Sequence, residues 1–397
     1  MLAHIYAIYL LFSMKKNVLF TLLIVSLTSF SQIKTDSIFS KKLNAFRKIS
    51  ISVPKSFSKD VKKTYPVFVV LDGDYLFDAF NGTLTYGAYW DDLPEMIIVG
   101  IHQSETRFDD CNYDIETALP EGKSSQFFEF IGGELLPYIE KKYPTSPFRM
   151  IAGHDVTAGF LNFFLYKDDP IFNAYISLAP ELAPGMDVNI PSRFGNITKP
   201  VLYYHCTADG DVKKIKENCG ILDENLKNLK NLKNIQNPNI KYVFDELKNA
   251  SHYSLVTYAI PNALYQFFNA YQPISNIEFQ EKIVKLPSGY VDYLTTKYDE
   301  IDKIMGSKTT IRYSDFKAIE AAILKNKAYN EFEKLAGTSK KMYPKSMLSD
   351  YHLAMFYEDT GEYKKAAKSY QNAYQLEEIG NLTKEMMLKK SEQLRTK

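Results

Sequence analysis

Short, uninterrupted apolar runs separated by amphipathic stretches are the feature that most constrains the fold of this chain. Runs of this length are typical of strands that are buried on both faces of a mainly parallel sheet. Repeated strand–helix units predict a doubly wound α/β architecture. The expected strands are Arg47–Val53, Pro66–Leu71, Met96–Ile101, Phe148–Ala152, Ala174–Ala179, Val201–Cys206 and Ile240–Asp245. The expected helices are Ser124–Lys142, Asp155–Tyr166, Val212–Asn234 and Tyr253–Tyr271.

The chain of 397 residues is long enough for two domains, and its texture changes after Gln272-Pro273. Strand-like runs stop there, and Lys, Glu, Tyr, Leu and Ala dominate the remainder. This change predicts an α/β domain over residues 32–273 and a small all-α segment over residues 274–397.

Residues 350–373 resemble one tetratricopeptide unit, a pair of antiparallel helices. Small residues stand at the positions where such helices pack closely, and Gly361 separates the two helical patterns; the small positions are Ala354, Ala366 and Ala373, and aromatic Tyr370 lies among them. A weaker helical pair precedes it over Tyr313–Leu335 and Met342–Pro344. The resemblance implies a groove for a protein partner; the alternative is a helical cap that covers a sheet edge or aids dimerisation.

The first 31 residues have the pattern of an export signal. Met14-Lys15-Lys16 supplies positive charge, Val18–Phe30 is apolar, and small residues precede Gln32. We expect cleavage there, a translation start at Met14, a periplasmic or secreted protein and no membrane span after cleavage. Residues 1–13 are also apolar, so an uncleaved anchor is the alternative.

Charge and cysteine usage exclude several classes of function. The net charge of +1 argues against nucleic acid as a partner. No CxxC or HExxH spacing occurs, so we expect neither a metal nor a cofactor. Three cysteines, Cys111, Cys206 and Cys219, cannot all pair within one chain, and Cys206 lies in an apolar run that predicts a buried thiol.

The stretch Leu71-Asp72-Gly73-Asp74 follows one apolar run, and Arg107, Asp109 and Asp110 follow the next. These residues and the order of the elements resemble the putative-esterase branch of the α/β-hydrolases, which includes S-formylglutathione hydrolases and ferric-enterobactin esterases. The resemblance covers roughly residues 35–271. It implies the α/β-hydrolase fold and a small ester-like substrate.

The resemblance also implies roles for particular residues. The nucleophile turn, which connects a strand to a helix, falls at Asp155, and the histidine after the last strand is His252. The acid follows the strand Val201–Cys206, where both Asp209 and Asp211 are candidates. Backbone amides for an oxyanion hole would come from Val156 and from Gly73 or Asp74.

Asp155 departs from the family pattern, because a serine is expected there and a glycine is expected at Thr157. A carboxylate has no proton to give to histidine, and its attack on an ester would form a high-energy mixed anhydride. It would also occupy the position of a developing oxyanion. Loss of a serine nucleophile typically removes about 10⁶ in rate, so ordinary serine-esterase activity is not expected. The β-branched Thr157 would crowd the turn and relax it.

Two hypotheses follow for function. In the first, the protein binds a small ligand or a protein partner without carrying out the serine reaction. In the second, it is an active hydrolase in which Asp155 is the nucleophile or a water-activating base, together with His252 and Asp211 or Asp209. A third possibility is that the helical segment is the functional part and the hydrolase-like domain is its platform.

Overall fold

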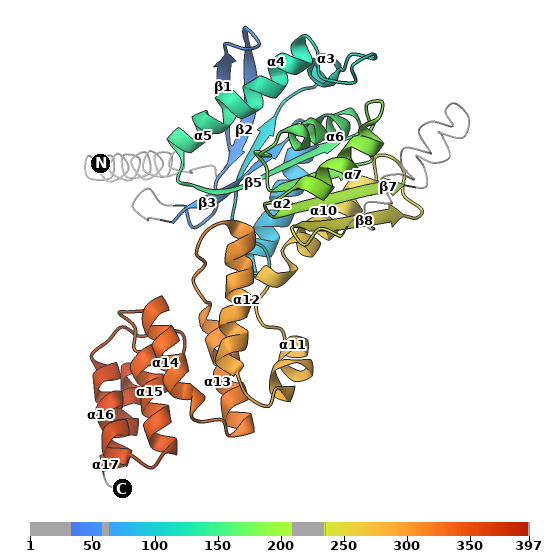
Figure 1. The fold of residues 1–397 in the computed structure, drawn as a ribbon. Coiled ribbons are helices and arrows are strands. Elements are labelled where there is room, and N and C mark those ends of the chain that lie inside the picture. Colours follow the sequence, from blue (N-terminus) through green and yellow to red (C-terminus); the bar gives the residue numbers. More distant parts are fainter. Residues whose placement is uncertain (1–32, 58–62, 209–233, 235, 396–397) are drawn as a thin grey trace, which may run out of the picture.

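The computed structural model describes residues 33–57, 63–208, 234 and 236–395. Within these residues, eight strands form one mixed sheet in the order β1-β2-β4-β3-β5-β6-β7-β8. Figure 1 shows the sheet and the helices around it. The pairs β1–β2 and β2–β4 are antiparallel, and the remaining pairs are parallel. The strands are β1 (Ile33–Ser40), β2 (Ala45–Ser52), β3 (Tyr65–Val70), β4 (Ile97–Ile101), β5 (Thr145–His154), β6 (Ala174–Leu178), β7 (Val201–Ala208) and β8 (Ile240–Leu247).

Helices cover both faces of this sheet. On one face lie α2 (Leu76–Tyr89) and α10 (Leu255–Phe267), which is followed by η4 (Asn269–Tyr271). The other face carries α4 (Lys123–Phe130), η1 (Ile131–Leu135), α5 (Leu136–Lys142), α6 (Val156–Phe160), η2 (Leu161–Tyr166) and α7 (Met186–Asn196), while α3 (Arg107–Cys111) packs beside α4 and α6. Along β3, Phe68 and Val70 face the first layer, and Val67 and Val69 face the second. The predicted doubly wound α/β fold is therefore confirmed.

Four elements of the sheet domain were not predicted from the sequence: β1, α2, α3 and α7. Strand β1 has the polar sequence IKTDSIFS, because it is an edge strand paired on one side only. Helix α2 contains Gly82 and Gly87, which are poor helix formers, but it buries Leu76, Phe80 and Leu84 against the sheet. Helix α7 contains Pro191. The helix predicted over Val212–Asn234 lies outside the described residues, apart from Asn234.

The C-terminal part of the described chain is entirely helical. Its elements are α11 (Asn276–Glu281), η5 (Ile283–Lys285), α12 (Tyr290–Met305), α13 (Tyr313–Asn326), α14 (Glu331–Met342), α15 (Leu348–Asp359), α16 (Tyr363–Tyr374) and α17 (Lys384–Arg395). No helix among the described residues is both long and apolar enough to cross a membrane.

The hairpin of α15 and α16 has the geometry expected from the sequence. Gly361 lies between the helices with φ 77°, a left-handed conformation that glycine adopts readily. Ala354, Ala366 and Ala373 are buried between the helices, and so is Tyr370. The paired helices are confirmed, whereas their assignment to the tetratricopeptide family stays a prediction.

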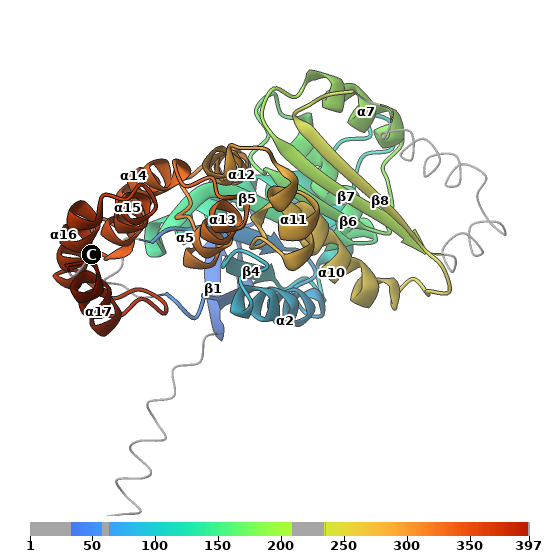
Figure 2. The same cartoon turned by 90° about the horizontal axis from the view of Figure 1, so that it is seen from below.

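The helical segment is attached near the amino-terminal ends of the central strands. Gly306 approaches Pro147 at the start of β5. Arg312 lies over the Tyr271 ring at 4.3 Å and donates from Nη2 to the Asp91 carbonyl at 3.1 Å. Figures 1 and 2 show this segment projecting from one side of the sheet domain. The carboxyl ends of β3, β4 and β5, where the predicted site residues lie, are therefore at the far end of the strands from these contacts.

Candidate functional site

Asp155 occupies a sharp strand-to-helix turn between β5 and α6. Its backbone has φ 60° and ψ −121°, a conformation that costs a non-glycine residue roughly 1–3 kcal/mol. Three backbone hydrogen bonds hold it: Asp155 N donates to the Leu178 carbonyl at 2.9 Å, and its own carbonyl accepts from Gly159 N and Glu181 N. The side chain is 29% exposed. The turn therefore presents the carboxylate toward solvent at the carboxyl end of β5.

Thr157 stabilises this turn instead of relaxing it, which corrects the expectation from its β-branched side chain. Its hydroxyl accepts from His154 N at 2.8 Å and lies 2.7 Å from Asp72 Oδ2 and 2.9 Å from the His154 carbonyl. The close approach is accommodated at Gly153, where a Cβ would lie 2.7 Å from Thr157 backbone atoms. The strained conformation is thus kept without a glycine at position 157.

Arg107 contacts two carboxylates at the centre of the site. Its Nη1 lies 3.2 Å from Asp155 Oδ2, and its Nε lies 2.7 Å from Asp72 Oδ1. Its Nη2 donates to Asp72 Oδ2 at 3.2 Å and to the His154 carbonyl at 2.8 Å. Burial opposes the charged guanidinium, but Asp72 outweighs this effect and the pKa of Arg107 is raised. The arginine is therefore a permanent cation with all three nitrogens engaged.

His252 faces Asp155 as the sequence predicts. Its Nε2 lies 3.9 Å from Asp155 Oδ1, within ion-pair range but beyond hydrogen-bond distance. The ring of His252 lies beside that of His154, with centroids 4.5 Å apart. His154 Nε2 donates to the His252 carbonyl at 3.0 Å, and this bond positions the backbone of the loop that carries His252.

His154 and Tyr75 connect this histidine pair to Asp72. The hydroxyl of Tyr75 lies 3.0 Å from Asp72 Oδ2 and 3.0 Å from His154 Nδ1. Burial, and then the neighbouring His252, lower the pKa of His154, so its ring favours the neutral form. Burial and Asp72 raise the pKa of Tyr75, which keeps its phenol protonated. His154 is therefore a packed residue whose hydrogen bonds connect Tyr75 to the loop that carries His252.

The backbone amides suggested for an oxyanion hole differ in whether they already donate a hydrogen bond within the protein. The Gly73 amide donates to the Ile101 carbonyl at 2.7 Å, so it is already engaged. Gly73 is instead required for close packing, because a Cβ there would lie 2.8 Å from the Gly100 backbone. This corrects the Gly73 alternative. Within the described part of the chain, the amides of Val156 and Asp74 donate to no protein acceptor.

Asp74 has a further part in shaping the site. Its carboxylate accepts from Gln103 N at 2.7 Å and Ser104 N at 3.0 Å, and it lies 2.9 Å from His102 Nδ1. These bonds join the loop after β3 to the loop after β4. Arg107 follows the second of these loops, so Asp74 helps to place the arginine.

Asp209 and Asp211, which the sequence predicts as candidates for the acid partner of His252, both lie outside the described residues. Cys219 and the signal sequence lie outside them as well. Cys111 and Cys206 are buried thiols, as predicted for Cys206. In the described ranges, no three His, Cys, Asp or Glu side chains cluster closely enough to hold a metal ion.

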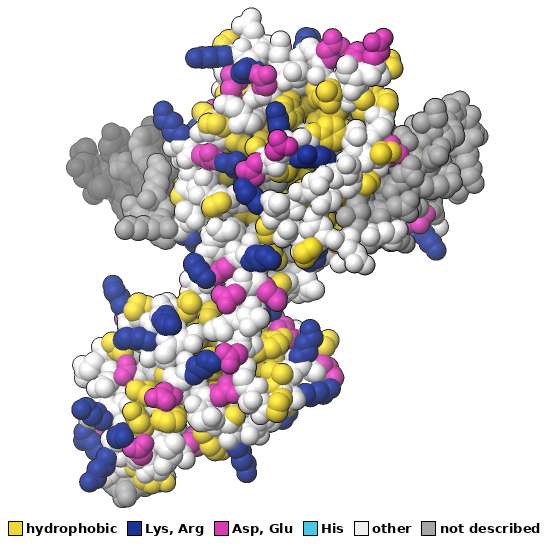
Figure 3. Space-filling view, viewed as in Figure 1, with side chains coloured by type: hydrophobic (Ala, Val, Ile, Leu, Met, Phe, Trp, Pro, Cys, Tyr) yellow, Lys and Arg dark blue, Asp and Glu magenta, His cyan; other side chains and the backbone are white. Residues whose placement is uncertain are grey.

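A pocket opens directly beside the turn. Its volume is about 350 Å³, and Val156, which follows Asp155, is part of its wall. Aromatic residues Phe108, Tyr113, Phe160 and Phe163 line it together with Glu181. Figure 3 shows hydrophobic side chains gathered on this face of the sheet domain, next to charged ones. The pocket therefore lies next to the turn that carries Asp155.

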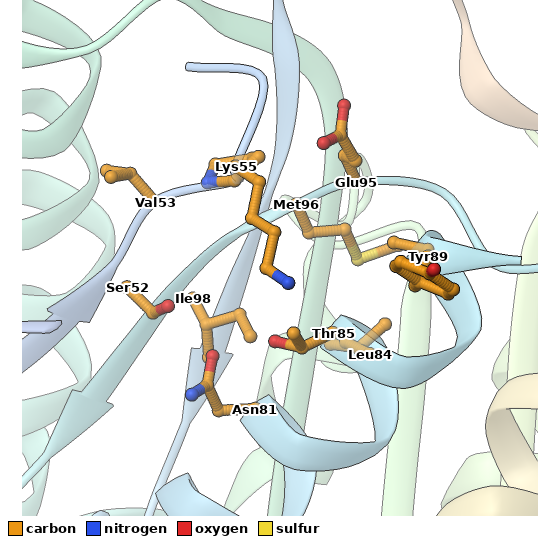
Figure 4. Close-up of a pocket in the computed structure, with 12 residues that line it drawn as sticks. Ser52, Val53, Lys55, Asn81, Leu84, Thr85, Tyr89, Glu95, Met96 and Ile98 are labelled. Atoms are coloured by element: carbon orange, nitrogen blue, oxygen red, sulfur yellow. The ribbon is translucent and has the colours of Figure 1, made fainter. Parts of the chain in front are cut away.

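A second, smaller cavity of about 160 Å³ lies elsewhere, between α2 and the strands β2 and β4 (Figure 4). Its wall includes Ser52 and Met96, at the end of β2 and just before β4. The amine of Lys55 points into it and lies 5.8 Å from the Tyr89 ring. None of the predicted site residues lines this cavity.

Sequence reasoning missed the roles of Arg107, Asp72 and Glu181. The sequence marks Arg107 and Asp72 only as residues that carry the family resemblance and predicts no contact between them. Both follow buried strands, β4 and β3, that are neighbours in the sheet. Carboxyl ends of adjacent parallel strands meet at one edge, so an arginine after one strand and an aspartate after the other was a usable signal. No comparable signal marks Glu181.

Comparisons with known proteins point to an esterase-like fold, in agreement with the observed sheet and helices. Residues 40–184 match the family model described as "putative esterase". The fold, the turn and this match define an esterase-like α/β-hydrolase fold protein. No curated protein matches the sequence.

Solved structures extend the comparison to nearly the whole chain. An uncharacterised protein from Capnocytophaga ochracea is 27% identical, with a TM-score of 0.81 over 92% of this chain and 100% of that one. An "IroE-like serine hydrolase" from Shewanella oneidensis is 19% identical, with a TM-score of 0.59 over 78% of this chain and 99% of that one. A "siderophore hydrolase" from Aspergillus nidulans is 16% identical, with a TM-score of 0.50 over 60% and 94% of the two chains. The Capnocytophaga match covers too much of the chain to be confined to the sheet domain, so it includes helical-segment residues.

Proposed function

We propose that this chain is an exported esterase-like protein that binds a small ligand beside Asp155 and lacks ordinary serine-esterase activity. The observation that carries the proposal is the ion pair between Arg107 and Asp155, with Nη1–Oδ2 at 3.2 Å. The guanidinium disperses the charge of the carboxylate and holds one of its oxygens. Such a carboxylate is a poor nucleophile and has no proton to transfer to His252.

The surrounding backbone supports a binding role. The turn is as sharp as a hydroxyl nucleophile would need, and the Val156 and Asp74 amides remain available to polar ligand atoms. The pocket beside Val156 provides apolar surface for the rest of the ligand. Recognition of an ester-like or related small molecule is thus supported without the chemical step that follows it in serine hydrolases.

A second candidate function is hydrolysis through Asp155 itself, and the position of His252 favours it. The distance of 3.9 Å between Nε2 and Asp155 Oδ1 leaves His252 able to activate a water molecule near the carboxylate. In that reaction Asp155 attacks a saturated carbon and displaces its leaving group, and an alkyl ester forms on the enzyme. Water activated by His252 then adds to the carboxyl carbon of Asp155 and releases the alcohol.

Two measurements separate these functions. Purified protein is assayed against p-nitrophenyl acetate and butyrate, together with His252→Ala. The binding role predicts equal background rates for both proteins, and turnover that His252→Ala abolishes would contradict it. Single-turnover reaction in ¹⁸O-labelled water with alkyl halides and epoxides tests the second function. Label in the Asp155 carboxylate would establish the covalent route, and absence of label would exclude it.

Export rests on the sequence of residues 14–31. Expression of the full chain in a Gram-negative host should yield mature protein beginning at Gln32 in the periplasmic fraction or the medium, as measured by intact mass. Protein that retains residues 14–31 would contradict cleavage.

A further inference from the structure

The pocket beside Val156 has an unequal distribution of charge. Asp109 and Glu181 are the charged residues among those that line it, and no lysine, arginine or histidine lines it. Asp109 is already paired with Lys123 at the surface, with Nζ–Oδ2 at 2.7 Å. Glu181 has no hydrogen-bond or ion-pair partner for its carboxylate within the described part of the chain. Among the described residues, Glu181 is thus an exposed acidic residue of this pocket that forms no ion pair.

Among the described residues no cation forms an ion pair with Glu181, although the charge of Arg107 acts to lower its pKa. Its backbone amide donates to the Asp155 carbonyl at 3.1 Å, so the two acidic residues belong to the same corner of the site. Arg107 is the nearby cation, and its nitrogens are engaged by Asp72, Asp155 and the His154 carbonyl. Three carboxylates, those of Asp72, Asp155 and Glu181, thus share one guanidinium. The site has room for a further positive charge.

Aromatic rings form much of the remaining wall. Tyr113 and Glu181 both line the pocket, and burial and then the Glu181 carboxylate raise the pKa of Tyr113. The Phe108 side chain is 72% exposed at the mouth, and Phe160 and Phe163 form the inner side. An ammonium group over an aromatic face is stabilised by the ring quadrupole.

We propose that this pocket selects a ligand with an amine or quaternary ammonium group, held between Glu181 and Tyr113, and with an apolar body against Phe160 and Phe163. This inference deepens the proposed binding function and rests on it. A volume of about 350 Å³ fits a small molecule such as an aralkylamine or an amine-bearing ester.

The electrostatic state of Glu181 is consistent with such a ligand. Burial, and then the charge of Asp155, raise the pKa of Glu181. A bound cation would relieve this repulsion and favour the ionised carboxylate. A bound carboxylate would add to the repulsion, so an anionic ligand is disfavoured.

Three probes of similar size test the proposal on the wild-type full chain: 2-phenylethylamine, 2-phenylethanol and phenylacetate. Titration calorimetry should give at least tenfold tighter binding of the amine than of the alcohol or the carboxylate. Glu181→Gln, which keeps the size of the side chain, should remove most of this preference. Glu129→Gln, which changes an exposed carboxylate that is paired with Lys42 and does not line the pocket, is the matched control and should change the affinity for the amine less than twofold.

Several outcomes would overturn the proposal. Equal binding of amine and alcohol, preferred binding of the carboxylate, or no binding of the amine at millimolar concentration would each exclude a cation-selective pocket. So would an unchanged preference in Glu181→Gln. These outcomes are independent of the ester assay with His252→Ala, so failure of the charge preference can be distinguished from failure of the binding function as a whole.

Discussion

The guanidinium of Arg107 joins Asp155 at the strand-to-helix turn to Asp72 at the end of the neighbouring strand, with Nη1–Oδ2 and Nε–Oδ1 distances of 3.2 Å and 2.7 Å. The Asp72 side chain is only 2% exposed, whereas Asp155 is 29% exposed. The arginine therefore pairs with the buried Asp72 carboxylate through Nε and holds Asp155, at the nucleophile position, through Nη1.

Replacement of Arg107 should destabilise the protein. Arg107→Met leaves the buried Asp72 carboxylate without its cation, and removal of one partner from such a pair typically costs about 3 kcal/mol or more. Urea denaturation monitored by circular dichroism measures the loss. Lys123→Met, which breaks the exposed pair with Asp109, is the control and should cost less than about 1 kcal/mol. An equal loss in the free energy of unfolding for the two substitutions would show that the buried Arg107–Asp72 pair stabilises the protein no more than the exposed pair does.

The protein should be more stable with threonine at position 157 than with the glycine of the family motif. Thr157→Val keeps the shape but leaves His154 N without its acceptor and removes one of the donors to Asp72, which should cost about 1–3 kcal/mol. Thr157→Gly restores the motif yet loses the same bonds, so it should be at least as unstable. A Thr157→Gly protein more stable than wild type would show that the turn is crowded after all. Thermal unfolding of the three proteins distinguishes these cases.

Gly159 should not tolerate any side chain. A Cβ at this position would overlap the Glu181 carbonyl oxygen, which is part of the loop that lines the pocket. Gly159→Ala should therefore reduce the yield of folded protein or shift that loop. Gly82→Ala, in the middle of α2 with nothing within 4 Å of the new methyl group, should stabilise the helix by roughly 0.5–1 kcal/mol. Soluble yield and melting temperature of the pair provide the measurement.

Acid should weaken the helical segment through His352. Burial lowers the pKa of this fully buried histidine, although Glu320, with Oε2 at 3.5 Å from Nε2, acts in the opposite direction. The folded chain therefore keeps the ring neutral at a pH where the unfolded chain, with a pKa of about 6.5, binds a proton. Stability is retained above that pH and falls as the pH decreases below it.

The size of this effect can be measured with one variant. Between pH 7.5 and 5.5, wild type should lose roughly 1 kcal/mol more than His352→Gln in urea denaturation. His154, whose pKa is also lowered, contributes a loss of the same sign in both proteins. An identical pH dependence of the two proteins would mean that His352 is protonated in the folded state.

The sequence predicts most of the sheet because buried parallel strands have an unmistakable apolar pattern, and β3 to β8 fall close to their expected ranges. Edge strand β1 and helix α2 are not predicted, because their sequences lack a comparable pattern. Most residues of β1 are exposed, and α2 depends on burial of Leu76, Phe80 and Leu84 to outweigh its glycines. Tertiary packing, which a single sequence does not display, decides both elements.

The site is predictable only in part, for a similar reason. Asp155 and His252 are found from their positions after particular strands, and the structure brings them together. Arg107, Asp72 and Thr157 form a network through distances that depend on the register of β3, β4 and β5. The interpretation of Thr157 as a disruptive residue is wrong because its hydroxyl, and not its branched shape, determines its contribution.

The central claim is that a carboxylate held by Arg107 prevents the serine reaction at an otherwise ordered turn. The most direct measurement compares hydrolysis of p-nitrophenyl butyrate by wild type, Asp155→Ser and the double variant Asp155→Ser/His252→Ala. We expect wild type to stay at the background rate and Asp155→Ser to exceed it at least tenfold, with the gain abolished in the double variant. Wild-type turnover above background that is lost in His252→Ala alone would contradict the claim.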